Sequence, residues 1–139
     1  ELEEEVKLFA KYSKNIYFHE AVSPGMLLNY TSSADIGICI EEPICRSWEY
    51  ALPNKLFEYM ICNLPVIVGG LPEMISFVNN NDTGFIIENI YDLNKFDKQL
   101  DIIIKTYKTK LTNIKIKAKE FNWQTQEKVL IKLYKDLGE

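Results

Sequence analysis

Short apolar runs alternate with longer amphipathic segments along most of this chain. Four runs have the length of strands, and they fall at residues 16–19, 36–40, 66–68 and 85–87. Apolar side chains three and four positions apart predict helices before and between these runs, at residues 2–12, 25–32, 53–62 and 73–79. This alternation indicates an α/β fold, with a Rossmann-like parallel sheet covered by helices on both faces.

The last third of the chain, residues 92–137, has the pattern of further helices with breaks near Thr112 and Asn122. Residues 79–84, Asn-Asn-Asn-Asp-Thr-Gly, have the composition of a turn. No internal repeat, low-complexity tract or linker divides the sequence. With 139 residues and 47% apolar content, the chain is predicted to form one globular domain.

The segment from Tyr50 to Gly70 combines a helix start, a helix, a turn and a buried strand. Pro53 suits the first helical position, because its fixed φ is helical and its missing N–H would have no partner there. The amides that follow, those of Asn54, Lys55 and Leu56, then point out of the positive helix end. Lys55 adds a full charge, so this helix start is predicted to bind an anion such as phosphate.

The helix that follows Pro53 has an apolar and a polar side. The apolar stripe consists of Leu56, Phe57, Met60 and Ile61, and the polar side of Asn54, Lys55 and Glu58. Glu58 lies one turn behind the predicted phosphate, where its carboxylate can accept hydrogen bonds from a pair of sugar hydroxyls. An ordinary solvated helix face is the alternative interpretation of this side.

Histidine and cysteine usage narrows the possible chemistry. His19 is the only histidine, and it ends the predicted strand 16–19 at the carboxyl edge, where open parallel sheets bind ligands. It is interpreted either as a structural strand-end residue or as part of a ligand pocket. Cys39, Cys45 and Cys62 are odd in number and lack paired metal spacing, so neither a disulfide framework nor a metal site is predicted. Cys39 is predicted to be a core residue.

Charge and hydropathy limit the partners. A net charge of −4 and a pI near 5.1 argue against nucleic acid. The lysines between residues 105 and 119 are interpreted as solvated helix faces, and a peripheral contact with the anionic inner face of a membrane stays open. No apolar stretch has the length of a membrane span and no signal peptide opens the chain, so the sequence predicts a soluble, cytoplasmic protein.

Residues 52–60, Leu-Pro-Asn-Lys-Leu-Phe-Glu-Tyr-Met, followed by Leu-Pro-Val at 64–66, resemble the signature of a known family. The family is that of the retaining glycosyltransferases of GT-B architecture, of the "glycosyl transferases group 1" type. The flanks are similar to it as well, at residues 15–19, 28–38, 83–87 and 121–123. The likeness covers nearly the whole chain in the right order, which makes it more specific than one motif.

The resemblance implies that residues 1–139 are a partial C-terminal, nucleotide-sugar-binding domain. This would be an N-terminally truncated half of a GT-B architecture, followed by C-terminal helices. In the family this half begins with a strand, a glycine-containing turn, a helix and a second strand, whereas this sequence opens on a helix. We therefore expect a piece of a longer enzyme that is inactive by itself.

Family roles carry over only to matching positions. Glu58 matches the acid that binds the ribose hydroxyls in relatives, whereas the acid that touches the transferred sugar is replaced by Tyr50, with Glu49 beside it. Residues 51–53 stand where many relatives have a Gly-Phe-Gly run whose amides reach the phosphates. The implied donor-binding set is Glu58, Lys55, Asn54, Pro53, Leu52, Ala51, Tyr50 and His19.

The implied activity is hexosyltransferase-type transfer of a sugar from a nucleoside diphosphate to an acceptor hydroxyl, with the anomeric configuration kept, in polysaccharide or glycoconjugate synthesis. The nucleotide sugar is a substrate, no metal or other cofactor is required, and an acceptor saccharide or lipid-linked sugar would bind through the missing N-terminal domain. No catalytic residue is assigned.

Two alternatives share the architecture. One is a GT-B nucleotide-sugar epimerase. The other is a non-catalytic nucleotide-sugar-binding module, which stays an alternative because Tyr50 replaces the acid that touches the sugar in relatives. A receiver-type domain is disfavoured because no Asp ends a strand near Glu41 and Glu42. A dinucleotide-dependent oxidoreductase is disfavoured because residues 69–72, Gly-Gly-Leu-Pro, lack the required glycine spacing.

Overall fold

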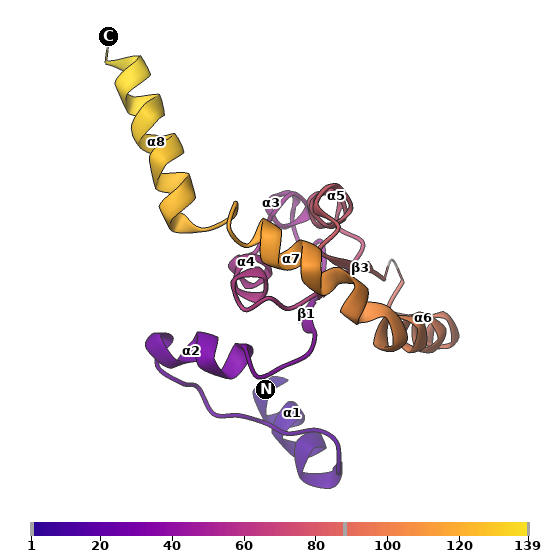
Figure 1. The fold of residues 1–139 in the computed structure, drawn as a ribbon. Coiled ribbons are helices and arrows are strands. Elements are labelled where there is room, and N and C mark those ends of the chain that lie inside the picture. The colour runs from indigo at the N-terminus through magenta and orange to yellow at the C-terminus, as the bar shows by residue number, and fades with distance from the viewer. Residues whose placement is uncertain (1, 88, 139) are drawn as a thin grey trace.

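The computed structural model of the protein describes residues 2–87 and 89–138. At its centre lies a three-stranded parallel sheet in the order β1-β2-β3, formed by Gly37–Cys39, Val66–Val68 and Gly84–Ile86. The register places Ile38, Ile67 and Phe85 side by side. Helices flank the sheet on both faces (Figure 1). The predicted α/β class with a parallel sheet is therefore confirmed.

The helices follow the predicted order, with one addition. Their bounds are α1 Leu2–Tyr12, α2 Pro24–Thr31, α3 Arg46–Glu49, α4 Asn54–Ile61, α5 Pro72–Asn81, α6 Leu93–Thr106, α7 Leu111–Lys117 and α8 Trp123–Leu137, with a 3-10 helix, η1, at Tyr107–Lys110. Helix α3 was not predicted from the sequence, because a single helical turn is too short to show a helical period. None of the helices described is long and apolar enough to cross a membrane.

One face of the sheet is covered by α4 and α5. Cys39, Val66 and Val68 point to this face and form a buried cluster with apolar side chains of the two helices, among them Leu56, Met60, Met74, Phe77 and Val78. The predicted core positions Cys39, Leu56 and Met60 are therefore confirmed. Ile61, the last residue of the apolar stripe, is 45% exposed, so the stripe is buried only in part.

Two glycines let this layer pack closely. A Cβ atom on Gly37 would overlap the ring of Tyr59, and one on Gly84 would overlap the backbone carbonyl of Val66. The Tyr59 ring thus lies over β1, and its hydroxyl donates a hydrogen bond to the Ile38 carbonyl at 3.1 Å. Burial raises the pKa of the Tyr59 hydroxyl, which keeps it protonated as a donor.

The other face of the sheet is covered by α6. Ile67, Ile87 and Ile103 form its buried cluster, and Phe85, Phe96 and Leu100 pack against them. This cover does not reach β1, since Ile38 is 58% exposed while its register neighbour Ile67 is 3% exposed. The prediction of helices on both faces therefore holds for β2 and β3 and only for one face of β1.

Residues 16–19 do not form a strand, so this prediction is wrong. Ile16 and Tyr17 are exposed, and Lys7 of α1 lies over the Phe18 ring at 4.8 Å from its centroid. An apolar run becomes a strand only when another strand pairs with it, and the apolar pattern does not report whether one is in reach. His19 consequently ends no strand of the sheet.

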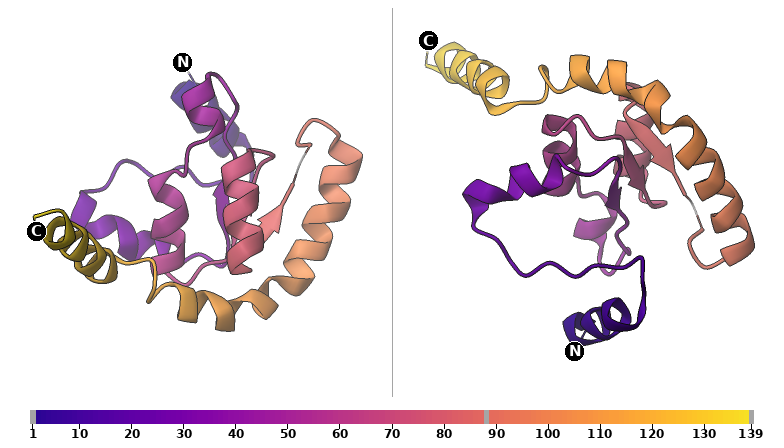
Figure 2. Two further views of the ribbon diagram at one scale, coloured as in Figure 1. Left: turned by 90° about the horizontal axis from the view of Figure 1, so that it is seen from above. Right: turned by 60° about the horizontal axis from the view of Figure 1, so that its bottom comes forward.

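The C-terminal helices leave the sheet in a curved path (Figure 2). The predicted break near Thr112 occurs earlier, at η1, where the Thr109 hydroxyl donates to the Thr106 carbonyl at 2.7 Å. The predicted break at Asn122 is confirmed, because its side chain caps α8 by accepting from the Thr125 amide at 2.9 Å. Helix α8 then projects away from the sheet (Figure 1).

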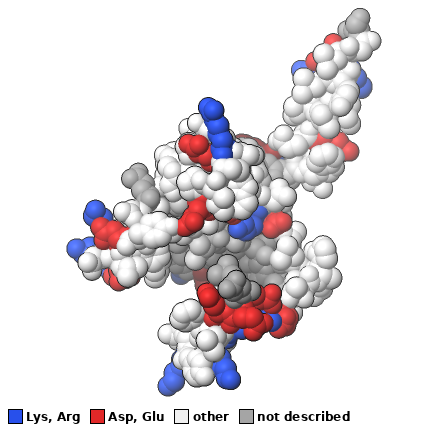
Figure 3. Space-filling view, turned by 180° about the vertical axis from the view of Figure 1, so that it is seen from behind, with Lys and Arg blue, Asp and Glu red and all other residues white. Residues whose placement is uncertain are grey.

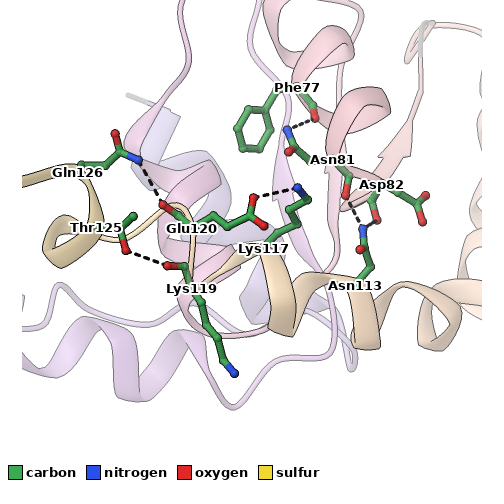
Figure 4. Close-up of polar contacts among 9 residues, drawn as sticks. All are labelled: Phe77, Asn81, Asp82, Asn113, Lys117, Lys119, Glu120, Thr125 and Gln126. Carbon is green, nitrogen blue, oxygen red and sulfur yellow. Dashed lines mark hydrogen bonds and ion pairs between the residues drawn. The ribbon is translucent and has the colours of Figure 1, made fainter. Parts of the chain in front are cut away.

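Polar contacts fix both ends of α7 (Figure 4). Asn113 donates to the backbone carbonyls of Asn81 and Asp82 at the end of α5. After α7, Thr125 donates to the Lys119 carbonyl at 2.9 Å, and Gln126 donates to that of Glu120 at 3.2 Å. These bonds set the direction in which α8 leaves.

The turn predicted at residues 79–84 is shorter in the structure. Helix α5 runs on to Asn81 and ends at Asp82, whose φ of 50° is left-handed. Strand β3 then begins at Gly84, one residue before its predicted start, and Ile87 lies beyond its end. Element boundaries commonly differ by this amount.

Lys110 and Lys117, from the predicted solvated region 105–119, form ion pairs with Asp82 and Glu120. On the face seen in Figure 3 the basic side chains are scattered, while acidic ones gather over α1, whose first turn carries Glu3, Glu4 and Glu5.

Candidate functional site

The carboxyl ends of the three strands open into a cavity of about 420 Å³. Residues directly after each strand line it: Ile40, Glu41, Glu42, Pro43 and Ile44 after β1, Gly69, Gly70 and Leu71 after β2, and Ile87, Ile90 and Tyr91 after β3. Ligands of open α/β sheets bind outside this edge, and their pockets measure roughly 300–1,000 Å³. Both position and size therefore make this cavity the leading candidate site.

A second, smaller cavity of about 210 Å³ lies beside the first and shares Glu41 with it. Its other lining residues are Trp48 of α3, Ala51 and Pro53 before α4, and Met74 of α5. Glu41 thus lines two spaces, one over the strand ends and one between the starts of α4 and α5.

Helix α4 begins at this edge because it runs antiparallel to the strands. Pro53 is its N-cap, with φ −66° and ψ 147°, so the helix begins one residue later than predicted. No side chain caps it. The Leu56 amide donates to the Pro53 carbonyl at 3.0 Å and is not free, which corrects its predicted role. Within the described residues, the amides of Asn54 and Lys55 have no acceptor.

Lys55 forms an ion pair with Glu41, with 2.7 Å between Nζ and Oε1. This hydrogen bond is the main reason that the pKa of Lys55 is raised above its ordinary value. The positive end of α4 therefore carries a fixed cation held over the carboxyl edge of β1. An anion bound to the Asn54 and Lys55 amides would compete with Glu41 for this cation.

The far side of the larger cavity is closed by a second polar contact. The Tyr91 hydroxyl donates to the Glu42 carboxylate, which connects the segment after β3 to the segment after β1. This bond raises the pKa of the Tyr91 hydroxyl. Two acidic residues, Glu41 and Glu42, hence line this cavity, and Glu41 connects it to Lys55 at the start of α4.

The predicted donor-binding residues around the start of α4 line two different spaces. Ala51 and Pro53 line the smaller cavity, and Lys55 stands beside it through Glu41. Leu52 and Asn54 instead line a groove of about 610 Å³ with Phe57, Phe121 and Trp123, on the side from which α8 departs. The structure thus brings Lys55 to the strand ends and turns Asn54 toward α8.

Glu58 lies one turn into α4, on the face opposite Leu56 and Met60, and is partly exposed. It is not buried beneath the sheet. The carboxylate is close to Cys62, whose thiol donates to the Leu28 carbonyl of α2 at 3.5 Å. Burial, and secondly Glu58, raise the pKa of the Cys62 thiol.

Tyr50 and His19 lie outside this arrangement. Tyr50 caps the end of α3, where its amide donates to Trp48, and its side chain is 53% exposed. The His19 ring packs edge-on against Tyr30 of α2, with 4.9 Å between centroids. Since residues 16–19 form no strand, the argument that placed His19 at the carboxyl edge is wrong.

Four acidic or aromatic residues of the cavities were not in the predicted set: Glu41, Glu42, Trp48 and Tyr91. Glu41 carried a usable signal, because it directly follows an apolar strand. Trp48 and Tyr91 lie on a single-turn helix and a loop, for which spacing predicts no direction. Among the described residues, no group of three or more His, Cys, Asp or Glu side chains could hold a metal ion.

The chain matches no family model, no curated protein and no solved structure. The geometry alone therefore defines the class: an α/β domain with a parallel sheet and a ligand-sized cavity at the carboxyl edge. Such a site can bind an anion at the helix start and hydroxyl groups at its carboxylates.

Proposed function

We propose that the chain is the donor-binding part of a retaining glycosyltransferase of GT-B architecture and binds a nucleoside diphosphate sugar. One observation carries the proposal: the amides of Asn54 and Lys55 have no acceptor among the described residues, and Lys55 pairs with Glu41, which lines both cavities at the carboxyl ends of the strands. Phosphates bind at helix starts in this position of α/β folds. The sequence of residues 52–60 resembles that family at the same helix.

In this proposal the diphosphate occupies the start of α4. The Asn54 and Lys55 amides donate to its oxygens, and Lys55 exchanges Glu41 for phosphate when the donor binds. The same groups stabilise the charge that develops on the departing diphosphate, so part of the catalysis is electrostatic. Glu58, one turn farther along α4, accepts hydrogen bonds from the ribose hydroxyls. The acceptor binds to a different part of the full-length protein.

The test is isothermal calorimetry on the full-length protein with uridine, guanosine and adenosine diphosphates and the matching nucleosides. A diphosphate should bind more tightly than its nucleoside, and the difference should shrink as the salt concentration rises. Equal affinity for diphosphate and nucleoside at low salt would contradict a phosphate site at α4.

Glu58→Gln tests the ribose contact separately. Charge-assisted hydrogen bonds contribute on the order of 1.5–3 kcal/mol each, so nucleoside diphosphate affinity should fall at least about tenfold. Glu127→Gln, on the exposed helix α8, is the matched control and should bind normally. Lost stability with normal affinity in Glu58→Gln would make the residue part of the scaffold.

A non-catalytic nucleotide-sugar-binding module is the second candidate. It is favoured by Tyr50, which stands exposed at the position where the family carries its sugar-binding acid. Measuring sugar transfer and donor hydrolysis by the full-length protein distinguishes the two functions.

A further inference from the structure

Charge is distributed very unevenly along this chain. Residues 102–119 contain six lysines and no Asp or Glu, so all twenty acidic residues lie outside this segment. The segment carries a charge of +6 in a protein whose net charge is −4, which leaves −10 for the rest of the chain. Residues 102–119 are therefore a strongly basic part of an acidic protein.

This basic segment covers the end of α6, η1 and α7, which follow one another along a curved path (Figure 2). Ile103 and Ile114 mark its inner side, because both are buried against the rest of the protein. Helical geometry places Lys105 and Ile116, each two residues later, on the opposite, outer side. Ile104 and Ile116 are 55% and 54% exposed, so apolar surface lies among the lysines.

The lysines of this segment differ in whether an acid neutralises them. Lys110 forms an ion pair with Asp82 at the end of α5, and Lys117 forms one with Glu120. The other four are exposed and form no ion pair within the described residues: Lys105, Lys108, Lys115 and Lys119. Four cations thus stay available to a partner outside this chain.

The acidic side chains of α1 lie on another side of the molecule. They gather on the face of Figure 3, which is seen from behind Figure 1, whereas α7 runs across the front of Figure 1. Seen from above, α1 and α7 lie on opposite sides of the molecule (Figure 2, left). An anionic surface that approaches α7 therefore meets lysines, while the acids of α1 face away from it.

The side chains between the lysines indicate which kind of polyanion fits. Exposed isoleucines gain energy at the apolar boundary of a bilayer and gain none on the phosphate backbone of a nucleic acid. Bases stack on aromatic rings and arginine, and residues 102–119 contain no arginine. Their one aromatic residue, Tyr107, donates to Asp35 at 3.2 Å. This combination favours an anionic membrane over nucleic acid.

We propose that the outer side of residues 102–119 docks on an anionic membrane surface. The four unpaired lysines contact lipid phosphates, and Ile104 and Ile116 enter the headgroup region. Clusters of roughly 4–8 basic residues bind such surfaces, and each contributes a factor of about five in affinity. None of these residues lines the two cavities at the strand ends, so the proposal is independent of the proposed function.

The test is cosedimentation of the full-length protein with phosphatidylcholine vesicles that contain either no phosphatidylglycerol or about one third of it. The protein should bind the anionic vesicles and not the neutral ones. Binding should weaken as the salt concentration rises, because salt screens the lysines. Equal binding to both kinds of vesicle, or binding to neither, would overturn the proposal.

Paired substitutions locate the surface. Lys115→Gln with Lys119→Gln should lower the partition coefficient on anionic vesicles on the order of twentyfold. Lys128→Gln with Lys132→Gln is the matched control, because it removes two exposed lysines at the same spacing on α8. The control pair should change binding less than about twofold. Equal losses from both pairs would overturn the proposal, since net charge and not this surface would then decide binding.

Two more variants test the surface independently. Lys105→Gln with Lys108→Gln, farther along the curve, should also weaken binding about tenfold or more. Ile116→Ala should weaken it severalfold even at high salt, because the lost contact is apolar, whereas Ile131→Ala on α8 should not. Normal binding by both the Lys105–Lys108 pair and Ile116→Ala would overturn the assignment to this surface.

A DNA duplex serves as the competing polyanion. If the full-length protein binds the duplex more tightly than the anionic vesicles at the same salt concentration, the surface recognises nucleic acid and the membrane assignment is overturned. These measurements use no nucleotide sugar. A failure here leaves the proposed function standing, and a failure of the nucleoside diphosphate test leaves the membrane surface standing.

Discussion

The two faces of the sheet share the same three strands but differ in how far their cover extends. On the α4–α5 side the buried cluster reaches β1, where Cys39 is fully buried. On the α6 side it stops at β2, so Ile38, the neighbour of Cys39 in the chain, stays exposed. Two adjacent apolar residues of one strand thus differ in burial: Cys39 is buried and Ile38 is exposed. The path of the helices decides burial, and hydrophobicity alone does not.

The faces also differ in polarity. The α4–α5 cluster is wholly apolar apart from the thiol of Cys39. By strand alternation Thr83 shares the α6 side with Phe85, and it is the only buried polar side chain among the described residues. Its hydroxyl has no hydrogen-bond partner among them. The α6 face is therefore covered less completely, and one of its buried polar groups has no described hydrogen-bond partner.

The largest effect is expected from comparing two isoleucines of one register row. Ile67→Ala should lower the free energy of unfolding by about 2–5 kcal/mol, because it leaves a cavity under α6. Ile38→Ala should change it by less than about 0.5 kcal/mol, since this side chain is mostly solvated. Urea denaturation of both variants measures the difference. A large loss from Ile38→Ala in the full-length protein would mean that another segment covers this face of β1.

A glycine substitution probes the tight packing on the α4–α5 face. A methyl group on Gly84 overlaps the Val66 backbone carbonyl, which cannot rotate away, so Gly84→Ala should lower the free energy of unfolding by about 1–3 kcal/mol. Gly25→Ala in α2 is the control, because a Cβ there meets no atom within 4 Å. It should be neutral, or stabilising by up to about 1 kcal/mol. Equal losses from both variants in thermal denaturation would show that the close approach has no special role.

Tyr59 connects the α4–α5 face to the open edge of β1. Tyr59→Phe removes its bond to the Ile38 carbonyl and should lower the free energy of unfolding by about 0.5–1.5 kcal/mol. The folded-state pKa of Tyr59 lies above its ordinary value of 10.0, so its stabilisation is complete below that pH and is lost as pH rises through the folded-state pKa.

Denaturation at neutral pH and above about pH 10 tests this, with the exposed Tyr134→Phe as control. The stability gap between wild type and Tyr59→Phe should narrow at alkaline pH. A gap that stays constant would show that the hydroxyl does not titrate with folding.

The smallest effect is expected from the buried Thr83 hydroxyl, which has no described hydrogen-bond partner. Thr83→Val replaces a buried hydroxyl without a described partner by a methyl group of similar size, so stability should be unchanged or rise by up to about 1 kcal/mol. Thr109→Val, which removes a hydroxyl bonded to the Thr106 carbonyl, should instead be slightly destabilising. A loss of more than about 1 kcal/mol from Thr83→Val would reveal a hydrogen bond to a group outside the described residues.

The sequence predicted elements well where local signals agree. Around α4 the proline, the apolar stripe and the Asn63-Leu64-Pro65 turn before β2 all predict a helix followed by a strand. The structure differs from the prediction by a single residue at each end of the helix. The prediction of a strand at residues 16–19 was wrong: these residues are an apolar run, but they do not pair with a strand of the described sheet. Pairing is a long-range property that no local pattern contains.

The candidate site was predictable only in part, for the same reason. The start of α4 and Lys55 follow from local sequence, because a helix start exposes its own amides. Glu41, Trp48 and Tyr91 reach the site from three other segments, and only the folded sheet brings them together. The ion pair between Lys55 and Glu41 joins residues that no spacing rule connects.

By itself the sequence determined the class of fold, the order of most helices and strands, and a helix start with two free amides. These depend on interactions between neighbours in the chain, such as helical periodicity, proline geometry and unpaired terminal amides. The tertiary structure decided that β1 is covered on one face only, that residues 16–19 stay unpaired, and that two cavities share Glu41. Those features depend on which distant segments come into contact. A local stretch of sequence does not predict such contacts, because their energy depends on residues elsewhere in the chain.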